Sequence, residues 1–332
     1  MTEQGDKPLV SVCIQTYQHA PYIRECIDSV LMQETNFPFE IILGEDDSTD
    51  GTREICIEYH NRHPDIIRLF LRSEKDKIYI NDEKTGRFNY IQNLKEAKGR
   101  YIALLDGDDY WISKNKLQQQ ADYMISNPDC SISFHKIFWV WNKGRSFIIN
   151  KNLPFVNTKF TLEDLIREYH INSCSTMFLQ SNISDMPAWF FDVPFLDYPL
   201  NIHNAGKGKV GYIADTMAVY RLHRTGMWSS KRAPQNLIRL WRLYSIMATN
   251  IFGETGIAMA EKRHRTGIEL IRHYKNHLWE SKIWLQKELE VKKFVKDEIL
   301  LKHLSAKRTF KNYLFNGFFL MKFIALKIFK KS

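Results

Sequence analysis

The 332-residue chain lacks several features that would assign it to a class at once. Its five cysteines are scattered, odd in number and without CxxC spacing, which favours buried free thiols over disulfides or a zinc site. No GxGxxG follows the first apolar run, which argues against a dinucleotide oxidoreductase. The chain also has no Gly- or Pro-rich linker and no internal repeat, so we expect its parts to pack together.

Long apolar runs and a leader segment are missing as well. The first residues, MTEQGDKPLVSVC, have no basic stretch followed by an apolar core, which predicts no secretory signal. No window reaches the roughly 18 uninterrupted apolar residues that a membrane-spanning helix needs. With 44% hydrophobic and 13% aromatic residues, the composition predicts a packed globular protein, which we expect in the cytoplasm.

The charge is unevenly distributed along the chain. Residues 231–332 hold 22 Lys and Arg against 8 Asp and Glu, whereas residues 1–230 hold 25 against 30. A protein that binds nucleic acid over its whole surface would not have a net negative charge on its larger part, so we expect no nucleic-acid partner. The asymmetry predicts two parts with different roles, a domain over 1–230 and a basic helical region over 231–332.

The first part alternates apolar β-rich runs with helical patterns. This alternation predicts an α/β fold with right-handed crossovers and a mainly parallel, Rossmann-like sheet flanked by helices. Ligands of such sheets lie beyond the carboxyl ends of the strands, so the polar loops there should hold the chemistry. We expect strands at 9–15, 39–45, 66–72 and 100–106, and helices at 21–31, 52–62, 88–98 and 114–126.

Beyond residue 126 the pattern is less regular. Residues 160–169 predict a short helix with Thr161 as its cap and Asp164 three residues later. From about Pro234 onward the sequence is helical, which predicts a helical appendage. Further strands are expected within 129–150 and at 174–180 and 209–223.

Four polar segments follow the predicted strands or stand apart from them. DGDDYW begins at Asp106, and its carboxylates favour a hard cation, Mg²⁺ or Mn²⁺, over a simple capped turn. GEDDSTDGT (44–52) either supplies a carboxylate that accepts a hydrogen bond from the N–H of a base, or forms only a turn and a helix cap. LDYPL (196–200) contains an isolated carboxylate, and YRLHRTGMWS (220–229) contains a histidine that is either structural or a ligand.

Taken in order, these motifs resemble the family 2 glycosyltransferases of GT-A fold, most of all the bacterial members of surface-polysaccharide assembly. The resemblance covers about residues 8–230 and includes the stretch AKGRYIALLDGDDYW (97–111). It departs from the family at Gln15, where Pro is usual, at Asp47, where a small residue is usual, and at Leu196, where Glu often precedes the base.

The resemblance implies a function for the matched positions. Asp197 would be the general base of a single inverting displacement, while Asp106, Asp108 and His223 would hold Mn²⁺ or Mg²⁺. The donor would be a nucleotide diphosphate sugar, most simply a UDP-sugar, and the acceptor a saccharide or lipid-linked saccharide. The donor-binding residues would be Thr16, Tyr17, Glu45, Asp46, Arg87, Asp106, Gly107, Asp108 and Trp228. The alternative is a nucleotide-sugar-binding protein, or an enzyme of another class, without glycosyl transfer.

The C-terminal stretch YLFNGFFLMKFIALKIF (313–329) is flanked by lysines and has no acid after Glu298. It is too interrupted to span a bilayer and too apolar for water. A helix lying in the membrane interface, with its lysines on anionic headgroups, fits this composition, and an ordinary packing helix is the alternative. We therefore expect a peripheral location on the inner face of the membrane.

Overall fold

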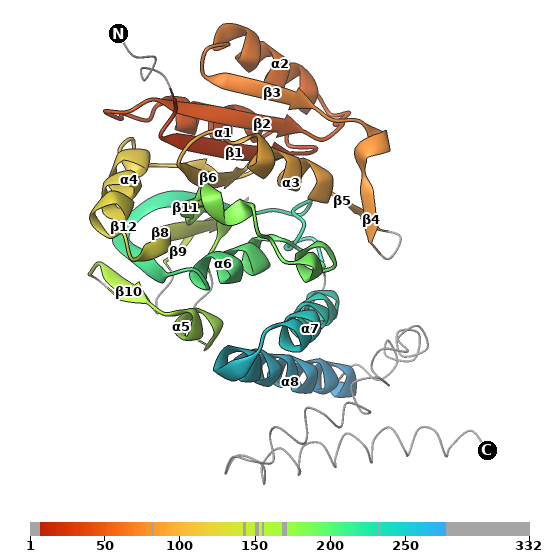
Figure 1. Cartoon of the computed structure of the whole chain (residues 1–332). Coiled ribbons are helices and arrows are strands. Elements are labelled where there is room, and N and C mark those ends of the chain that lie inside the picture. The colour runs from red at the N-terminus through yellow and green to blue at the C-terminus, as the bar shows by residue number, and fades with distance from the viewer. Residues whose placement is uncertain are drawn as a thin grey trace, which may run out of the picture. The chain divides into compact units, whose positions relative to one another are not determined.

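The computed structural model describes residues 7–276, apart from residues 81–82, 142–143, 150–152, 155, 168–170 and 232. The chain divides into two compact units, residues 1–263 and 264–332. The described residues of the second unit form the last part of one helix, and the first unit contains the other elements (Figure 1). The predicted interfacial segment, 313–329, lies outside the described residues.

One half of the central sheet is parallel, as the alternating pattern predicts. Its strands lie in the order β3-β2-β1-β6, and each neighbouring pair is parallel. Three helices, α1, α2 and α3, connect them (Figure 1). The strands are β1 (Val10–Thr16), β2 (Phe39–Glu45), β3 (Ile67–Leu71) and β6 (Tyr101–Asp106), and the helices are α1 (Ile23–Leu31), α2 (Thr52–Arg62) and α3 (Arg87–Glu96).

The other half of the sheet is mixed, which the sequence pattern does not predict. A short strand, β11 (Met177–Leu179), lies antiparallel between β6 and β8, and β8 and β12 are parallel to each other. The expected strand at 174–180 is shorter than predicted because residues Ser173–Ser175 form a 3₁₀ turn, η2. The other strands of this half are β7 (Tyr110–Trp111), β8 (Cys130–Trp141), β9 (Gly144–Ile149), β10 (Thr158–Phe160) and β12 (Lys209–Leu222).

Alternate residues of the strands pack against helices on opposite faces of the sheet. Val12 and Ile14 belong to a core cluster with residues of α1, α2 and α4 (Lys116–Ser126). Cys13 belongs to a second cluster with residues of α3, α6 (Asp197–Ala205) and α7 (Ala233–Asn250). Burial on both faces explains why these strands are continuously apolar. All five cysteines are buried and free, as expected.

The predicted cap at Thr161 is present at the start of α5 (Leu162–Arg167). The Thr161 backbone N–H and hydroxyl donate to Asp164 Oδ2 at 2.8 and 2.7 Å, and the Asp164 N–H donates back to the Thr161 hydroxyl at 3.2 Å. The pattern did not predict α6, because Pro199 breaks helices, but in the first turn its missing N–H costs nothing.

The remaining elements connect or follow the sheet. A small hairpin, β4 (Ile78–Ile80) and β5 (Glu83–Thr85), forms a separate two-stranded sheet. Short 3₁₀ turns are η1 (Glu74–Asp76), η3 (Gln180–Ile183) and η4 (Ala188–Phe191), and the last helix is α8 (Gly253–Asn276). Among the described residues, no helix is both long enough and apolar enough to cross a bilayer.

Candidate active site

The loop after β6 brings three aspartates to the carboxyl edge of the parallel strands. The Asp109 N–H donates to the Asp106 carbonyl at 2.9 Å, which closes a tight turn over residues 106–109. A Cβ on Gly107 would lie only 2.6 Å from Thr16 Oγ1 and 2.8 Å from His19 Nδ1. The position therefore requires glycine, because the loop packs directly on the end of β1.

The Asp106 carboxyl lies in the middle of this cluster. Gln15, its neighbour across the β1–β6 register, donates from Nε2 to Asp106 Oδ1 at 2.9 Å. Burial, followed by the charge of Asp108, raises the pKa of Asp106 to about 7, and the charge of Asp197 adds to the effect. Gln15 thus holds the carboxyl in place at the position where the family usually has proline.

Asp108 is paired with histidine. Its Oδ2 lies 2.9 Å from His223 Nε2 and 3.7 Å from His19 Nε2. Burial acts to raise the pKa of Asp108, but the hydrogen bond from His223 and the charges of both histidines bring it below its ordinary value. Thr225 contacts the other nitrogen of the His223 ring at 2.9 Å and so orients the imidazole. Asp108 and His223, both predicted to bind the metal, therefore lie in contact at the end of β12.

Arg221 joins the aspartate loop to β12. Its backbone N–H donates to Asp109 Oδ1 at 2.8 Å, and its guanidinium donates to the Asp108 carbonyl at 2.7 Å. The guanidinium also pairs with Glu25 of α1 and lies 4.3 Å from the centroid of the Tyr110 ring. Arg221 thus fixes the conformation of residues 108–109 from outside the cluster.

The cluster carries more negative charge than its surroundings neutralise. Burial, with the charges of Asp108 and Asp106, raises the pKa of Asp109 well above its ordinary value. Asp109 Oδ2 is buried without a hydrogen-bond partner among the described residues. A divalent cation bound here would neutralise the crowded carboxylates and give the buried oxygen of Asp109 a partner.

A cation here would take only part of its ligands from the protein. Among the described residues, no three His, Cys, Asp or Glu side chains converge closely enough to hold a metal ion by themselves. Asp106, Asp108 and His223 offer oxygen and imidazole ligands, which suit Mn²⁺ and Mg²⁺. Because these three side chains do not converge among the described residues, a divalent ion held by them would need further ligands, such as those of a phosphate group.

Asp197 is the first residue of α6 and is half-buried. Its carboxylate forms no hydrogen bond or ion pair with the described part of the chain. Its charge raises the pKa of Asp106 and, after burial, that of Tyr90. An unpaired carboxylate thus stands close enough to the aspartate cluster to act on it electrostatically.

The residues predicted to contact the base lie at the ends of β1 and β2, but they differ in accessibility. Glu45 is fully buried, where its oxygens accept the Ser48 N–H at 2.7 Å and contact Arg53 Nε at 2.9 Å. Asp46 is nearly buried and pairs with Lys77, whereas Tyr17 is exposed. Burial raises the pKa of Asp46, although Lys77 acts in the opposite direction. Glu45 therefore shapes the turn, and Asp46 is held by Lys77.

Arg87, predicted to reach the base, lies at the start of α3 and is buried. Its guanidinium donates to the carbonyls of Phe190, at 3.4 Å, Phe191, at 2.6 Å, and Val193. These bonds fix the chain that leads into α6 and Asp197. The predicted base contact of Arg87 stays a prediction.

Trp228 lies in the turn that follows β12 and is partly exposed. Its ring meets Phe195 edge-on with centroids 6.0 Å apart, which brings the turn next to the segment before Asp197. The Ser229 hydroxyl donates to the His223 carbonyl at 2.5 Å and closes the turn behind the histidine.

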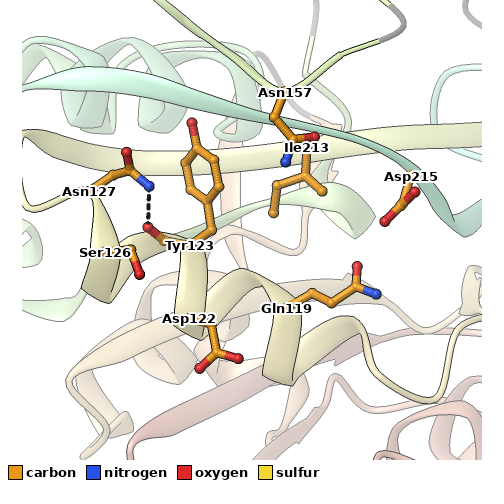
Figure 2. A pocket seen from close by; sticks show the side chains of 8 residues that line it. All are labelled: Gln119, Asp122, Tyr123, Ser126, Asn127, Asn157, Ile213 and Asp215. Carbon is orange, nitrogen blue, oxygen red and sulfur yellow. Dashed lines mark hydrogen bonds between the residues drawn. The ribbon is translucent and has the colours of Figure 1, made fainter.

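A separate pocket of about 390 Å³ lies between α4 and β12 and shares no residue with the aspartate cluster (Figure 2). Figure 2 shows the Tyr123 ring between the amide of Asn127 and the side chain of Ile213. Most of its lining residues are of polar types, and it carries none of the chemistry described above. It consists of Gln119, Asp122, Tyr123, Ser126, Asn127, Asn157, Ile213 and Asp215.

Sequence reasoning missed several residues of the site. His19 and Gln15 flank the predicted Thr16 and Tyr17, but no spacing rule marks them. Arg221 stands two residues before His223, where only the pairing of β12 reveals its contact with Asp109. Lys77 directly follows the 3₁₀ turn η1 and lies far from any predicted motif.

Comparison with known proteins finds similar sequences in bacteria. An uncharacterized protein of Mycobacterium tuberculosis is 31% identical over 67% of this chain and 61% of its own length. The Escherichia coli UDP-Glc:alpha-D-GlcNAc-diphosphoundecaprenol beta-1,3-glucosyltransferase WfgD is 32% identical over 68% of this chain and 82% of its own. The chain thus spans less than two thirds of the Mycobacterium relative's length.

A solved structure has the same fold. The mannosyltransferase PcManGT from Pyrobaculum calidifontis, in complex with GDP-Man and Mn²⁺, matches with a TM-score of 0.56. It is 17% identical, over 99% of this chain and 89% of its own. The fold is of the GT-A type, as the motifs predict. The model of glycosyl transferase family 2 matches residues 11–184, more than half of the chain, and the chain belongs to that family.

Proposed function

We propose that this protein transfers a sugar from a nucleotide diphosphate sugar to an acceptor hydroxyl with inversion of configuration. The observation that carries the proposal is the aspartate cluster of 106–109 with His223 and the unpaired carboxylate of Asp197 nearby. The cluster suits a cation and a diphosphate, and the lone carboxylate suits a proton acceptor. A single displacement needs just these two groups.

The residues have distinct roles in this proposal. Asp106, Asp108 and His223 would hold Mn²⁺ or Mg²⁺ together with the donor diphosphate. When bound, the cation stabilises the negative charge on the departing diphosphate. Gln15 and Arg221 keep the two aspartates in place, since each donates a hydrogen bond to the 106–109 loop. Thr16 and Gly107 form the wall of the loop against β1.

Asp197 would accept the proton of the acceptor hydroxyl. A carboxylate takes this proton late, when the hydroxyl oxygen is already bonding to carbon and has become acidic. Among the described residues, no cation pairs with Asp197, so its charge is available to the acceptor. Arg87 supports this role indirectly, because it ties down the carbonyls of residues 190–193 ahead of α6.

A UDP-sugar donor and a lipid-linked saccharide acceptor are the simplest substrates to test. WfgD acts on UDP-Glc and a diphosphoundecaprenol-linked saccharide, as its name states, and is 32% identical to this chain. The net positive charge of residues 231–332 would attract an anionic membrane surface, where such acceptors reside. Both substrates and the membrane contact are parts of the proposal.

The Asp197→Asn variant tests the central claim. Asparagine keeps the shape of the side chain but cannot accept a proton. Transfer from a panel of UDP-sugars in the presence of Mn²⁺ should fall by roughly 10²-fold or more, with donor affinity nearly unchanged. Asp192→Asn, an exposed carboxylate five residues earlier, is the matched control. Near-normal transfer by Asp197→Asn would refute the assignment of the base. A purified wild-type protein that binds nucleotide sugars but never transfers would favour the binding-protein alternative.

A further inference from the structure

Helix α7 lies outside the family match, yet it packs next to the proposed base. The family model ends at residue 184, before both Asp197 and α7. Leu243 and Tyr244 of α7 belong to the same core cluster as Leu196 and Tyr198, the two residues that flank Asp197. The side of the site where the acceptor is proposed to lie therefore includes a segment that the family model does not describe.

The ring of Tyr244 is held in place by its neighbours. It meets the Tyr198 ring edge-on, with centroids 5.9 Å apart and planes at 75°. The Lys262 ammonium of α8 lies 5.4 Å from the Tyr244 centroid and 5.0 Å from that of Tyr198. Lys262 itself donates to the Ile166 carbonyl of α5 at 2.9 Å. Contacts with α6 and α8, and through Lys262 with α5, therefore set the position of the Tyr244 hydroxyl.

The Tyr244 hydroxyl differs from the other tyrosine hydroxyls around Asp197. The Tyr198 hydroxyl contacts Lys262 Nζ at 3.3 Å, and the Tyr90 hydroxyl is enclosed without a partner among the described residues. The Tyr244 hydroxyl also forms no hydrogen bond with the described residues, but it is not enclosed, in a residue that is 6% exposed. A hydroxyl that is fixed, accessible and without a protein partner can bond a ligand.

Asp197 lies close enough to act on this hydroxyl. Burial, followed by the charge of Asp197, raises the pKa of Tyr244, so the phenol stays protonated at neutral pH and is a hydrogen-bond donor. The half-buried Asp197 carboxylate is an acceptor that forms no hydrogen bond or ion pair with the described residues. The two groups do not bond each other, so an available donor stands near an available acceptor.

A sugar with adjacent hydroxyls matches this pair of groups. Each sugar hydroxyl can both donate and accept a hydrogen bond. The reacting hydroxyl donates its proton to Asp197, and the neighbouring hydroxyl of the same ring accepts a hydrogen bond from Tyr244. A phosphate in this place would be repelled by the Asp197 carboxylate, and an apolar group would leave both side chains without a partner.

We infer that Tyr244 is an acceptor-binding residue, whose hydroxyl donates a hydrogen bond to the acceptor hydroxyl adjacent to the one that Asp197 deprotonates. This inference rests on the proposed function, because it adds a second contact to the same acceptor. It assigns part of the choice of acceptor to α7. A neutral hydrogen bond of this kind contributes about three- to tenfold in affinity, and an acceptor without the matching hydroxyl loses that contribution.

The experiment measures transfer by the full chain from a panel of UDP-sugars, with Mn²⁺ present, to soluble acceptors. The acceptors are methyl glycosides and short-chain lipid diphosphates of common hexoses, and the best of them is then compared with its monodeoxy analogues. Wild-type protein should use one analogue, which lacks the hydroxyl next to the reacting one, with a kcat/KM about three- to tenfold lower than that of the parent. The position of that hydroxyl also identifies the neighbouring site of transfer.

Variants assign this discrimination to Tyr244. Tyr244→Phe removes only the hydroxyl, so it should lower kcat/KM for the parent acceptor about three- to tenfold and should no longer distinguish the parent from that analogue. The dissociation constant of UDP, measured by calorimetry with Mn²⁺, should stay unchanged. Tyr198→Phe is the matched control, because it removes a hydroxyl of the same ring pair that contacts Lys262, and it should keep the discrimination. A melting curve for each variant separates unfolding from loss of acceptor binding.

The outcomes distinguish this inference from the proposed function. If the wild-type protein transfers sugar to no acceptor of the panel, the proposed function fails and the inference fails with it. If wild-type transfer is observed and Tyr244→Phe retains the full discrimination, or loses donor affinity to the same extent, the inference is overturned while the proposed function stands. If Tyr198→Phe loses the discrimination as Tyr244→Phe does, the effect comes from packing of the ring pair, and the inference is likewise overturned.

Discussion

Replacing Lys116 by methionine should stabilise the protein, although it removes a charged residue type. Lys116 begins α4, is fully buried, and its Nζ lies 3.8 Å from the centroid of the Trp111 ring. The amine has no hydrogen-bond partner among the described residues. Burial lowers the pKa of Lys116 well below its ordinary value. Folding therefore disfavours the ammonium form that the unfolded chain carries.

The magnitude follows from the proton that folding removes. A free lysine has a pKa of about 10.4, so deprotonating it at pH 7.5 costs up to about 4 kcal/mol at roughly 1.4 kcal/mol per pH unit. Methionine has a similar length, carries no proton and makes favourable contacts with an aromatic ring. Lys116→Met should accordingly raise the free energy of unfolding by up to about 4 kcal/mol at pH 7.5.

The dependence on pH provides the sharper test. Because the folded pKa lies below the unfolded one, the unfolded chain binds more protons, and wild-type stability rises with pH towards 10.4. The advantage of Lys116→Met should therefore shrink to about 1 kcal/mol at pH 9.5. Urea denaturation at both pH values measures it.

Lys114→Met is the control for this experiment. Lys114 is exposed and pairs with the equally exposed Glu34, so its replacement should change stability by less than about 1 kcal/mol at either pH. An advantage of Lys116→Met that stays constant between pH 7.5 and 9.5, or a loss of stability at pH 7.5, would refute the reasoning. A constant advantage would mean that the ammonium stays charged in the folded protein.

Three further predictions concern the site and the C-terminal region. Asp108→Asn should keep the fold but abolish the Mn²⁺ dependence of nucleotide binding, and calorimetry with unchanged Mn²⁺ dependence would contradict the metal assignment. Arg221→Ala should weaken that binding about tenfold through loss of its bond to the Asp108 carbonyl, whereas Glu25→Ala, at the exposed end of the ion pair, should change it little. Removing residues 307–332 should release the protein from anionic vesicles in flotation, since each lysine near such a surface contributes about 1 kcal/mol, and it should spare transfer to a soluble acceptor. Unfolding on truncation would instead favour a packing role for this segment.

Local pattern was sufficient for the parallel half of the fold. The strands that end at Thr16, Glu45 and Asp106 are continuous apolar runs, and segments with helical periodicity lie between them. Parallel strands all present their carboxyl ends to one edge, so the sequence alone predicts that these three residues lie at the same edge. The conformation of one strand and the loop after it depends mainly on local residues, so the periodicity of the sequence is enough to predict it.

The second half of the sheet could not be predicted in the same way. Nothing local indicates that β11 runs antiparallel between β6 and β8, or that Asp197 begins a helix despite Pro199. These features depend on which distant strands pair, and pairing is decided by burial of the whole sheet. Short strands carry too few residues to show a period of their own.

The sequence by itself determined the family of this protein, the strand ends that carry its carboxylates and the residue types that suit a cation. Only the tertiary structure decided which groups meet there: His223 with Asp108, Gln15 with Asp106, the Arg221 backbone N–H with Asp109, and Lys77 with Asp46. The reason is physical. Residue types and their spacing reflect forces that act within one strand or helix, whereas hydrogen bonds between side chains 31 to 115 positions apart form only after long-range packing fixes the backbone around them.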